Sequence, residues 1–254
     1  MVRTHGLAKH FRDNKGNIVK AVDGVSFEAQ PGRIFGLLGC NGAGKTTTLR
    51  ILSTVIRPTA GTAEVDGIDV LAEPEKVRSQ IGFMSTSTAL YGRLQAREVI
   101  EYFGGLYGLH GEPLRKRVDY VIDKLQIGEF ADRLCDKLST GQKQRVNIAR
   151  TILHDPPVLF FDEPTAGLDV VLSQTVMEFI EEARDMGKTI VFSTHIMSEV
   201  ERLCDHIAII HDGQIRGEGS VAQLKEQTGE ASLERAFLKI VQFESNYRRE
   251  EVKN

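Results

Sequence analysis

The stretch GCNGAGKT, residues 39–46, decides how the rest of this sequence is best interpreted. It fits the pattern G-x-x-x-x-G-K-[ST]. It stands between IFGLL, residues 34–38, which is typical of a buried strand, and a run with helical spacing that begins at Lys45. Glycines let the backbone wrap closely around an anion, and the first turn of a helix presents N–H groups with partial positive charge. The stretch therefore predicts a phosphate-binding loop.

The side chains of this loop indicate a nucleoside triphosphate and a magnesium ion as ligands. Lys45 reaches the β- and γ-phosphates, and the hydroxyl of Thr46 binds Mg²⁺. The loop residues expected to contact the nucleotide are Gly39, Asn41, Gly42, Ala43, Gly44, Lys45 and Thr46. The dinucleotide pattern G-x-G-x-x-G is not met, because no third glycine follows Gly42 and Gly44 at the required spacing. We therefore expect ATP and Mg²⁺ as cofactors.

A second motif, VLFFDEPT at residues 158–165, places two adjacent carboxylates after an apolar strand. Asp162 suits the acid that holds the metal ion in proteins with such a loop. Glu163 is placed to orient or deprotonate the attacking water. The alternative is a pair of solvated acids at the end of a strand.

Strand-like and helix-like segments alternate along the chain. Residues 2–36 read as short strands and turns, and VLFF, KTIVFS and DHIAIIHDGQI read as further strands separated by helical runs. This alternation predicts an α/β fold with a mostly parallel sheet. The pattern is helical between about residues 87 and 155, which predicts an inserted helical segment. Residues 221–254 are expected to form a C-terminal helix and a charged tail beyond the main domain, residues 1–220.

Composition narrows the classes of protein to which this chain can belong. Of its 254 residues, 41% are hydrophobic and 26% are charged, which suits a globular protein with a substantial core. The formal net charge of −3 gives no indication of a nucleic-acid partner. The apolar runs are far shorter than the ~20 residues of a membrane helix. Three cysteines without a metal-ligand spacing indicate neither a disulfide framework nor a zinc site, so a reduced cytosolic setting is expected.

The stretch KLSTGQKQRVNIAR, residues 137–150, has the features of a helix start. Ser139 and Gln142 fit a capping box, and Gly141 is expected to leave the N–H groups of the first turn uncovered. Apolar residues then recur at helical spacing. On this stretch alone an ordinary helix start is the simpler explanation, because capping boxes are common.

Taken in order, GCNGAGKTT, LSTGQKQR, FFDEPTAGLD and STH resemble the motifs of the ATP-binding-cassette (ABC) ATPases, and the similarity extends over residues 2–220. The resemblance implies a P-loop NTPase fold with a mostly parallel sheet, an N-terminal antiparallel β subdomain and an inserted α-helical subdomain. It also implies that two subunits sandwich two nucleotides head to tail. Ser139, Gly141 and Gln142 would then contact the γ-phosphate bound by the opposite subunit, a contact for which an exposed helix start is well suited.

Four further positions match the family singly. Phe11 stands where an aromatic residue stacks on adenine, and the alternative is an ordinary core residue. Thr47 follows the magnesium ligand and is expected to add a phosphate hydrogen bond. Asp169 matches the loop that signals across the dimer, and its alternative role is a helix N-cap. His195 follows a strand and matches the switch histidine at the γ-phosphate, with a structural histidine as the alternative. The expected catalytic set is Glu163, His195 and Lys45.

One position departs from the pattern of the family. Most members read IGYVPQ where this chain has IGFMST, so Thr86 replaces a glutamine that contacts Mg²⁺ and the membrane partner. A threonine can bind only through a shorter hydroxyl. Thr86 joins Thr46 and Asp162 in the expected set of metal contacts. The surrounding GFMSTSTALYGRLQARE, with LSTGQKQRVNIARTILHDP, resembles the sodium-exporter (NatA-type) branch, in which this glutamine is commonly absent.

The resemblance implies an ATP-hydrolysing subunit that dimerises on ATP and drives an exporter, with sodium or another cation as the implied cargo. Its partners would be a transmembrane permease on a separate chain, contacted through residues 85–94, and a second ATPase subunit, expected to be a copy of this one. The chain would lie peripherally on the cytoplasmic face of the cell membrane. The alternatives are the ATPase subunit of an importer and that of a drug or lipid exporter. Cassettes that act on ribosomes or chromosomes are disfavoured, because the chain has one cassette and no sustained heptads.

Overall fold

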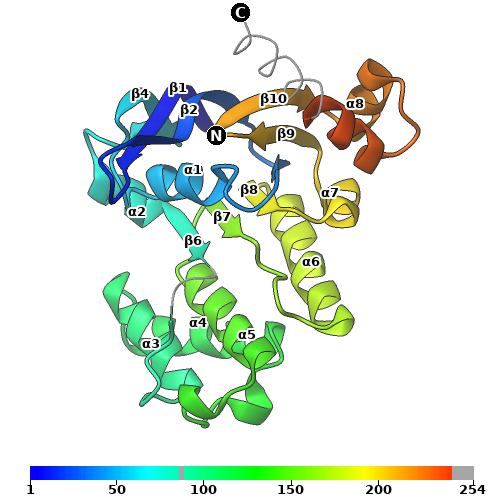
Figure 1. The fold of residues 1–254 in the computed structure, drawn as a ribbon. Coiled ribbons are helices and arrows are strands. Elements are labelled where there is room, and N and C mark those ends of the chain that lie inside the picture. Colours follow the sequence, from blue (N-terminus) through cyan, green and yellow to red (C-terminus); the bar gives the residue numbers. More distant parts are fainter. Residues whose placement is uncertain (86–88, 242–254) are drawn as a thin grey trace, which may run out of the picture.

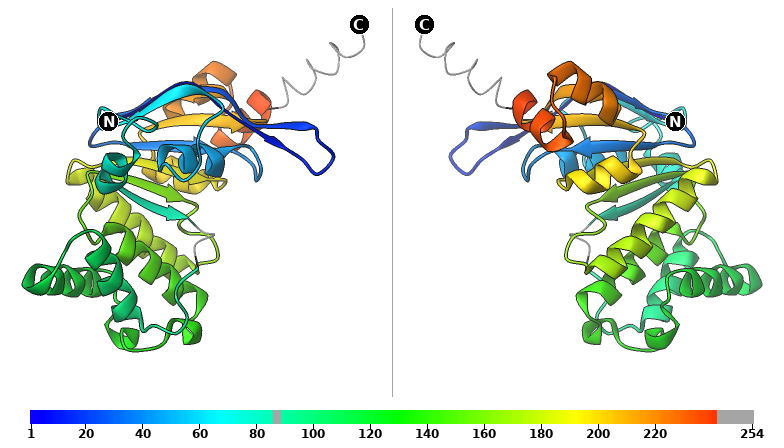
Figure 2. Two further views of the ribbon diagram at one scale, coloured as in Figure 1. Left: turned by 90° about the vertical axis from the view of Figure 1, so that its left-hand side faces the viewer. Right: turned by 90° about the vertical axis from the view of Figure 1, so that its right-hand side faces the viewer.

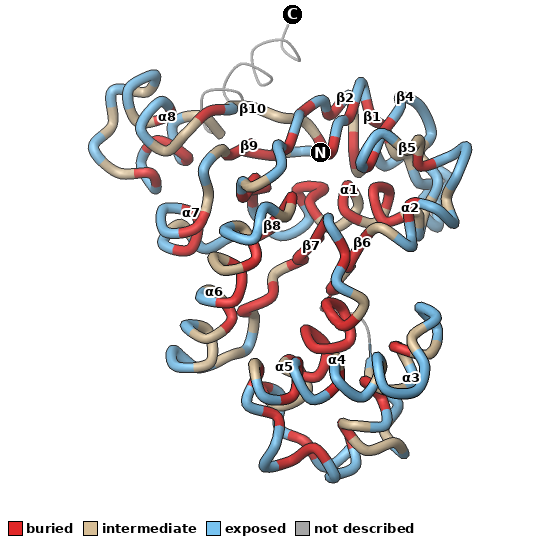
Figure 3. The backbone as a smooth tube through the Cα atoms, turned by 180° about the vertical axis from the view of Figure 1, so that it is seen from behind, coloured by how far each residue is buried: buried red, intermediate tan, exposed pale blue. Residues whose placement is uncertain are grey.

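A six-stranded sheet forms the centre of the computed structural model, which describes residues 1–85 and 89–241 (Figure 1). Its strands follow the order β10-β9-β3-β8-β7-β6, and all run parallel except β10. The bounds are β3 (Ile34–Leu38), β6 (Ile81–Ser85), β7 (Val158–Asp162), β8 (Thr189–Thr194), β9 (His206–His211) and β10 (Gln214–Gly219). Every residue of β3, β7 and β8 is buried, as expected for a parallel sheet covered on both faces. Figure 3 shows this for β7 and β8.

A second, antiparallel sheet has the order β2-β1-β4-β5. Its strands are β1 (Val2–Arg12), β2 (Ile18–Ala29), β4 (Ala60–Val65) and β5 (Ile68–Asp69). The expectation of short strands and turns over residues 2–36 is wrong, because β1 and β2 are 11 and 12 residues long. Gly6 and Gly24 have positive φ at shifts in the register of these two strands, so each strand bends at a bulge without ending. The resulting hairpin projects from the body of the molecule (Figure 2).

The predicted helical insertion lies between β6 and β7 and forms the lower part of Figure 1. It contains α3 (Ala96–Leu106), α4 (Gly111–Lys124), the short 3₁₀ helices η1 (Gly128–Phe130) and η2 (Cys135–Lys137), and α5 (Thr140–Ile152). Val99 and Val118 of the insertion share one buried cluster with Phe161 and Ile190 of the main sheet. The insertion and the sheet are therefore joined by a common hydrophobic core.

The other helices are α1 (Lys45–Leu52), α2 (Pro74–Gln80), α6 (Val170–Asp185), α7 (Met197–Leu203) and α8 (Val221–Thr228), followed by a helical stretch over residues 233–241. The sequence indicates one C-terminal helix beyond residue 220, whereas the structure has two, of which α8 was not predicted. Eight residues are little more than two turns, so the apolar period of α8 is hard to recognise. Both C-terminal helices pack on the sheet, in a cluster formed by Leu38, Val200, Ile207, Ile209, Leu224, Leu233 and Phe237.

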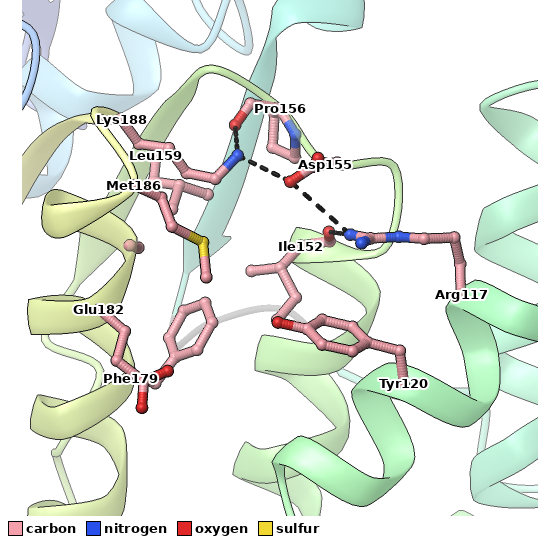
Figure 4. Close-up of a pocket in the computed structure, with 11 residues that line it drawn as sticks. Arg117, Tyr120, Ile152, Asp155, Pro156, Leu159, Phe179, Glu182, Met186 and Lys188 are labelled. Carbon is pink, nitrogen blue, oxygen red and sulfur yellow. Dashed lines mark hydrogen bonds and ion pairs between the residues drawn. The ribbon is translucent and has the colours of Figure 1, made fainter.

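Ion pairs also join the insertion to the main body, beside a small cavity between α4 and α6 (Figure 4). Asp155 Oδ1 lies 2.8 Å from Lys188 Nζ and 3.8 Å from Arg117 Nη2 of α4. Lys124 of α4 pairs with Glu182 of α6. The apolar wall of the cavity is formed by Tyr120, Ile152, Leu159, Phe179, Ala183 and Met186.

Over residues 1–85 and 89–241, no helix combines the length and apolar character needed to cross a bilayer.

Candidate functional site

The predicted phosphate-binding loop connects β3 to α1, and its backbone requires glycine. Gly42 and Gly44 have φ of 82° and 112°, in the region that glycine alone adopts readily. A Cβ atom on Gly44 would lie 2.4 Å from the carbonyl oxygen of Ala21 in β2. The same residue caps the start of α1, where the amide of Thr48 donates to the Gly44 carbonyl at 2.9 Å. The loop conformation therefore follows from both chain geometry and close packing.

A cleft opens at this loop and brings several of the predicted residues together; it is called the phosphate cleft below. It is lined by Ala21, Asn41, Gly42, Ala43, Gly44, Lys45, Thr46, Thr47 and Glu163. Gly39 lies at the start of the loop, where a Cβ atom would come within 2.4 Å of the Ile210 carbonyl oxygen. Two motifs more than a hundred residues apart in the sequence thus share one cleft.

The three residues of the expected catalytic set meet at a single carboxylate oxygen. Lys45 is buried, and its ammonium donates to the carbonyl oxygens of Gly39 at 2.7 Å and Cys40 at 3.2 Å. Glu163 Oε1 lies 3.2 Å from Lys45 Nζ and also 3.2 Å from His195 Nδ1. A cation, a carboxylate and an imidazole therefore converge at the edge of the phosphate cleft.

Glu163 holds this position through an uncommon backbone conformation. Its φ is 50°, which is rare for a residue with a side chain and persists only where the surroundings impose it. Its amide donates to the Ser193 carbonyl at 3.0 Å, and its carbonyl accepts from the Ala166 amide at 3.1 Å. The turn that follows β7 is therefore fixed on both sides of Glu163.

The neighbouring carboxylate, Asp162, is almost fully buried and lies at the end of β7. Its Oδ1 accepts hydrogen bonds from the Thr46 hydroxyl at 3.0 Å and from the Ser193 hydroxyl at 2.7 Å. Magnesium prefers such hard oxygen ligands, and it commonly takes one or two carboxylates together with substrate phosphates and water. The pair formed by Thr46 and Asp162 fits that donor set. In the part of the chain that the structure describes, no group of three or more His, Cys, Asp or Glu residues is arranged around a metal position.

Ser193 is a site residue that the sequence does not indicate. It belongs to the quoted STH motif, but no chemistry in the motif itself assigns it a role. It faces Asp162 because the two residues are register partners in the adjacent parallel strands β7 and β8. Strand order in a parallel sheet is a tertiary property, so a single sequence does not reveal this pairing.

The helix start at Ser139 has the predicted capping box, and its glycine, Gly141, packs against a neighbouring helix. The Gln142 amide donates to Ser139 Oγ at 3.3 Å, and the Ser139 amide donates to Gln142 Oε1 at 3.0 Å. Gly141 also has a packing role that its sequence context does not indicate. Gly141 is buried, and a Cβ atom there would lie 2.4 Å from Leu172 Cδ1 in α6. The glycine lets the starts of α5 and α6 pack closely.

The start of α6 carries Asp169, which acts as its N-cap by accepting from the Leu172 amide at 2.9 Å. Asp169 and Ser139 are both exposed. The structure does not bring Ser139, Gly141, Gln142 or Asp169 to the cleft that contains the phosphate loop. Ser139, Gln142 and Asp169 instead belong to a separate surface of the same chain, and Gly141 is buried beside it.

Phe11 lies on the projecting hairpin, and its side chain is 42% exposed, so the alternative of an ordinary core residue is wrong. Its ring centroid is 5.2 Å from Lys9 Nζ. Its cross-strand partner is Val19, two residues before Ala21, which lines the phosphate cleft. Phe11 therefore lies on the strand pair that borders the cleft. Thr86, the third expected metal contact, lies outside the described residues.

Comparison with known proteins gives consistent matches. The family model described as "ABC transporter" matches residues 22–166. The ABC transporter ATP-binding protein NatA of Bacillus subtilis is 38% identical over 239 residues, covering 94% of this chain and 97% of that protein. The daunorubicin/doxorubicin resistance ATP-binding protein DrrA of Streptomyces peucetius is 36% identical over 228 residues, covering 90% of this chain and 68% of that protein.

Solved structures match over most of the chain as well. The ATP-binding subunit of an ABC transporter superposes with a TM-score of 0.85 at 26% identity, covering 94% of this chain and 99% of that one. A dimeric ATP-binding cassette in a post-hydrolysis state, bound to ADP and Pi, gives a TM-score of 0.80 at 29% identity, covering 87% of this chain and 98% of that one. Fold, family match and relatives agree, and the chain therefore belongs to the ABC transporter family, as one of its ATP-binding, ATP-hydrolysing cassettes.

Proposed function

We propose that this cassette hydrolyses ATP between two copies of the chain and so powers a membrane exporter whose transmembrane span lies on a separate chain. The observation that carries the proposal is the convergence of Lys45 and His195 on one oxygen of Glu163, at the edge of the phosphate cleft. A site that binds ATP without hydrolysing it would have no need for a carboxylate placed in this way.

Within one chain, each residue has a proposed task. Lys45 exchanges its backbone contacts for the β- and γ-phosphates. Thr46 and Asp162 would hold Mg²⁺, which when bound would supply neutralisation of charge that develops on the phosphates. Glu163 orients or deprotonates the attacking water, and His195 contacts the γ-phosphate. Phe11 stacks on adenine, and Thr47 adds a phosphate hydrogen bond from the wall of the cleft.

The second copy completes the site. Ser139 stands at an exposed helix start, where partial positive charge suits an anion bound by another subunit. Next to it, Val170 and Val171 at the start of α6 are 86% and 76% exposed. Adjacent exposed valines beside a polar tip are typical of a surface that a partner covers. We propose that this surface faces the phosphate loop of the other copy, and that Asp169 transmits signals across the interface between the two copies.

The membrane partner is proposed to dock in a groove where the main body meets the insertion. Exposed aromatic side chains stand on the insertion nearby, including Tyr91 and Tyr102, whose rings make an edge-to-face contact at 5.7 Å. The groove between α2 and α3 is lined by Glu75, Arg78, Ser79, Phe103, Leu106, Tyr107 and His154. A groove of this kind suits a short amphipathic helix. Docking of the membrane partner in this groove would place the chain peripherally at the cytoplasmic side of the membrane.

Sodium or another small cation is the proposed cargo. The support is the relative named NatA, because this chain spans nearly the whole of that protein. A drug exporter is the second candidate, since the DrrA protein is almost as similar in sequence, although this chain spans only about two thirds of it. The ATPase subunit of an importer is the third candidate. Reconstitution of the co-purified complex in vesicles separates them: ATP-driven cation flux supports the first, and drug flux without cation flux overturns it.

The nucleotide sandwich itself is tested with purified chain. Glu163→Gln is expected to bind ATP, to lose nearly all turnover and to accumulate as an ATP-dependent dimer on size-exclusion chromatography. Adding Ser139→Arg should abolish that dimer while each monomer still binds ATP. Mixing the single variants Lys45→Ala and Ser139→Arg should restore activity that neither has alone, because a mixed dimer keeps one intact composite site. Unchanged ATPase activity of Glu163→Gln would remove Glu163 from its proposed role.

A further inference from the structure

Glu199 is a buried carboxyl group with both oxygens occupied by hydroxyl donors. It lies in the first turn of α7, directly after the loop that carries His195, and it is 6% exposed. Thr165 Oγ1 donates to Glu199 Oε1, and Thr194 Oγ1 donates to Glu199 Oε2 at 2.6 Å. Burying a carboxyl group is costly unless its oxygens are hydrogen-bonded, so this arrangement depends on both threonines.

The first of these threonines belongs to the turn that follows the catalytic acid. Thr165 comes two residues after Glu163 and is itself 5% exposed. Its carbonyl accepts from the Leu168 amide at 3.1 Å, which tightens the same turn. Through Thr165, Glu199 therefore holds the segment whose unusual backbone conformation places the Glu163 carboxylate.

The second threonine fixes the loop of the switch histidine. Thr194 is 1% exposed and precedes His195. Its hydroxyl donates to Glu199 and also accepts from the amide of Ile196 at 3.0 Å. The chain is thus held on both sides of His195, while the imidazole itself stays accessible, with its Nδ1 at 3.2 Å from Glu163 Oε1.

A further hydrogen bond connects this arrangement to the helix that starts at Ser139. Gln144 of α5 is buried, and its Nε2 donates to the Pro164 carbonyl at 2.6 Å. Pro164 lies between Glu163 and Thr165. The turn that Glu199 holds is therefore also tied to the helix whose tip is proposed to meet the nucleotide of the other copy.

We propose that Glu199 is a positioning residue for ATP hydrolysis, a brace that fixes the Glu163 turn and the His195 loop at one distance from each other. The proposal rests on the functions proposed above for Glu163 and His195. Glu199 is not among the residues that line the phosphate cleft. It acts by keeping two groups in register, and a misplacement of about 1 Å can cost a reaction on the order of 100-fold.

The test compares variants that cut the brace at different points. Glu199→Ala is expected to lower kcat by roughly 10- to 100-fold, with the KM for ATP changed by less than about threefold and ATP-dependent dimerisation retained. Thr165→Val and Thr194→Val each cut one arm. Their double variant should be little slower than either single variant, because one cut already disconnects the loops. Thr165→Ser and Thr194→Ser keep the hydroxyl and should restore most of the activity.

Thr151→Val is the matched control. Thr151 is 6% exposed and its hydroxyl donates to the Asn147 carbonyl within α5, so its loss removes a buried threonine bond outside the brace. Activity is expressed per folded chain, and the milder threonine variants decide the matter if Glu199→Ala does not fold. Multiplying losses in the double variant, or a normal kcat in folded Glu199→Ala, would overturn the brace. That outcome is distinct from failure of the proposed function, which would appear as normal turnover in Glu163→Gln.

Discussion

Replacing Ser193 by alanine removes the shorter of two hydroxyl hydrogen bonds to Asp162 Oδ1, at 2.7 Å, and leaves the 3.0 Å bond from Thr46. A hydrogen bond to a charged acceptor contributes about 1.5–3 kcal/mol. Loss of a group that orients a metal ligand typically weakens metal binding roughly 10- to 100-fold, which equals about 1.4–2.7 kcal/mol. The two estimates agree. We therefore expect the Mg²⁺ concentration for half-maximal ATPase activity to rise by about one to two orders of magnitude in Ser193→Ala.

The assay is a magnesium titration of ATP hydrolysis at saturating ATP, together with chemical unfolding of each variant. Ser53→Ala is the control, since Ser53 is also buried and its hydroxyl donates to a backbone carbonyl, that of Arg50, at 3.3 Å. This control should lose stability without a change in the magnesium requirement. The reasoning is refuted if Ser193→Ala unfolds more easily and yet its magnesium curve coincides with that of the wild-type protein.

Three further outcomes are expected. Gly44→Ala should abolish ATP binding in a fluorescence titration, because residue 44 has a φ of 112° and its new Cβ atom would lie 2.4 Å from a backbone oxygen. Gly105→Ala, whose Cβ atom would have no neighbour within 4 Å, should bind ATP normally in the same titration. MgATP should slow alkylation of the exposed Cys40 by a maleimide, measured by mass spectrometry; equal rates with and without nucleotide would place ATP elsewhere. Burial lowers the pKa of His154 from 6.5 to about 4, so its stabilising effect is complete above pH 6.5 and is lost progressively as the pH falls towards 4. Between pH 7 and 5.5 the wild-type protein should lose about 1 kcal/mol more unfolding free energy than His154→Gln, and parallel profiles would contradict this assignment.

Local features of the site could be predicted from the sequence because short spacings determine them. The glycine loop, the adjacent pair Asp162 and Glu163, and the capping box at Ser139 each depend on residues only a few positions apart. The role of Asp169 as a helix N-cap, one of its two predicted roles, also depends on residues close in the sequence. In these cases the backbone conformation and the chemistry are encoded in the same few residues.

Features that depend on strand order or on distant packing could not be predicted in this way. Ser193 and Glu199 acquire their partners only when β7, β8 and α7 come together. Gly141 was interpreted from its own helix, although its neighbour is Leu172 in α6. The long strands β1 and β2 were missed for a related reason, since a glycine that marks a turn in a single strand can also mark a bulge in a paired one.

The contact of Gly141 with Leu172 has a mechanical consequence. With no side chain on Gly141 to separate them, the tips of α5 and α6 pack closely at this point. A displacement of the helix start at Ser139 is therefore expected to move the turn at Asp169. Through the hydrogen bond of Gln144 it is also expected to move the segment after β7. The helix tip proposed to contact the other copy's phosphate is thus connected, through packing and one hydrogen bond, to the segment that carries Glu163, the carboxylate proposed to activate water.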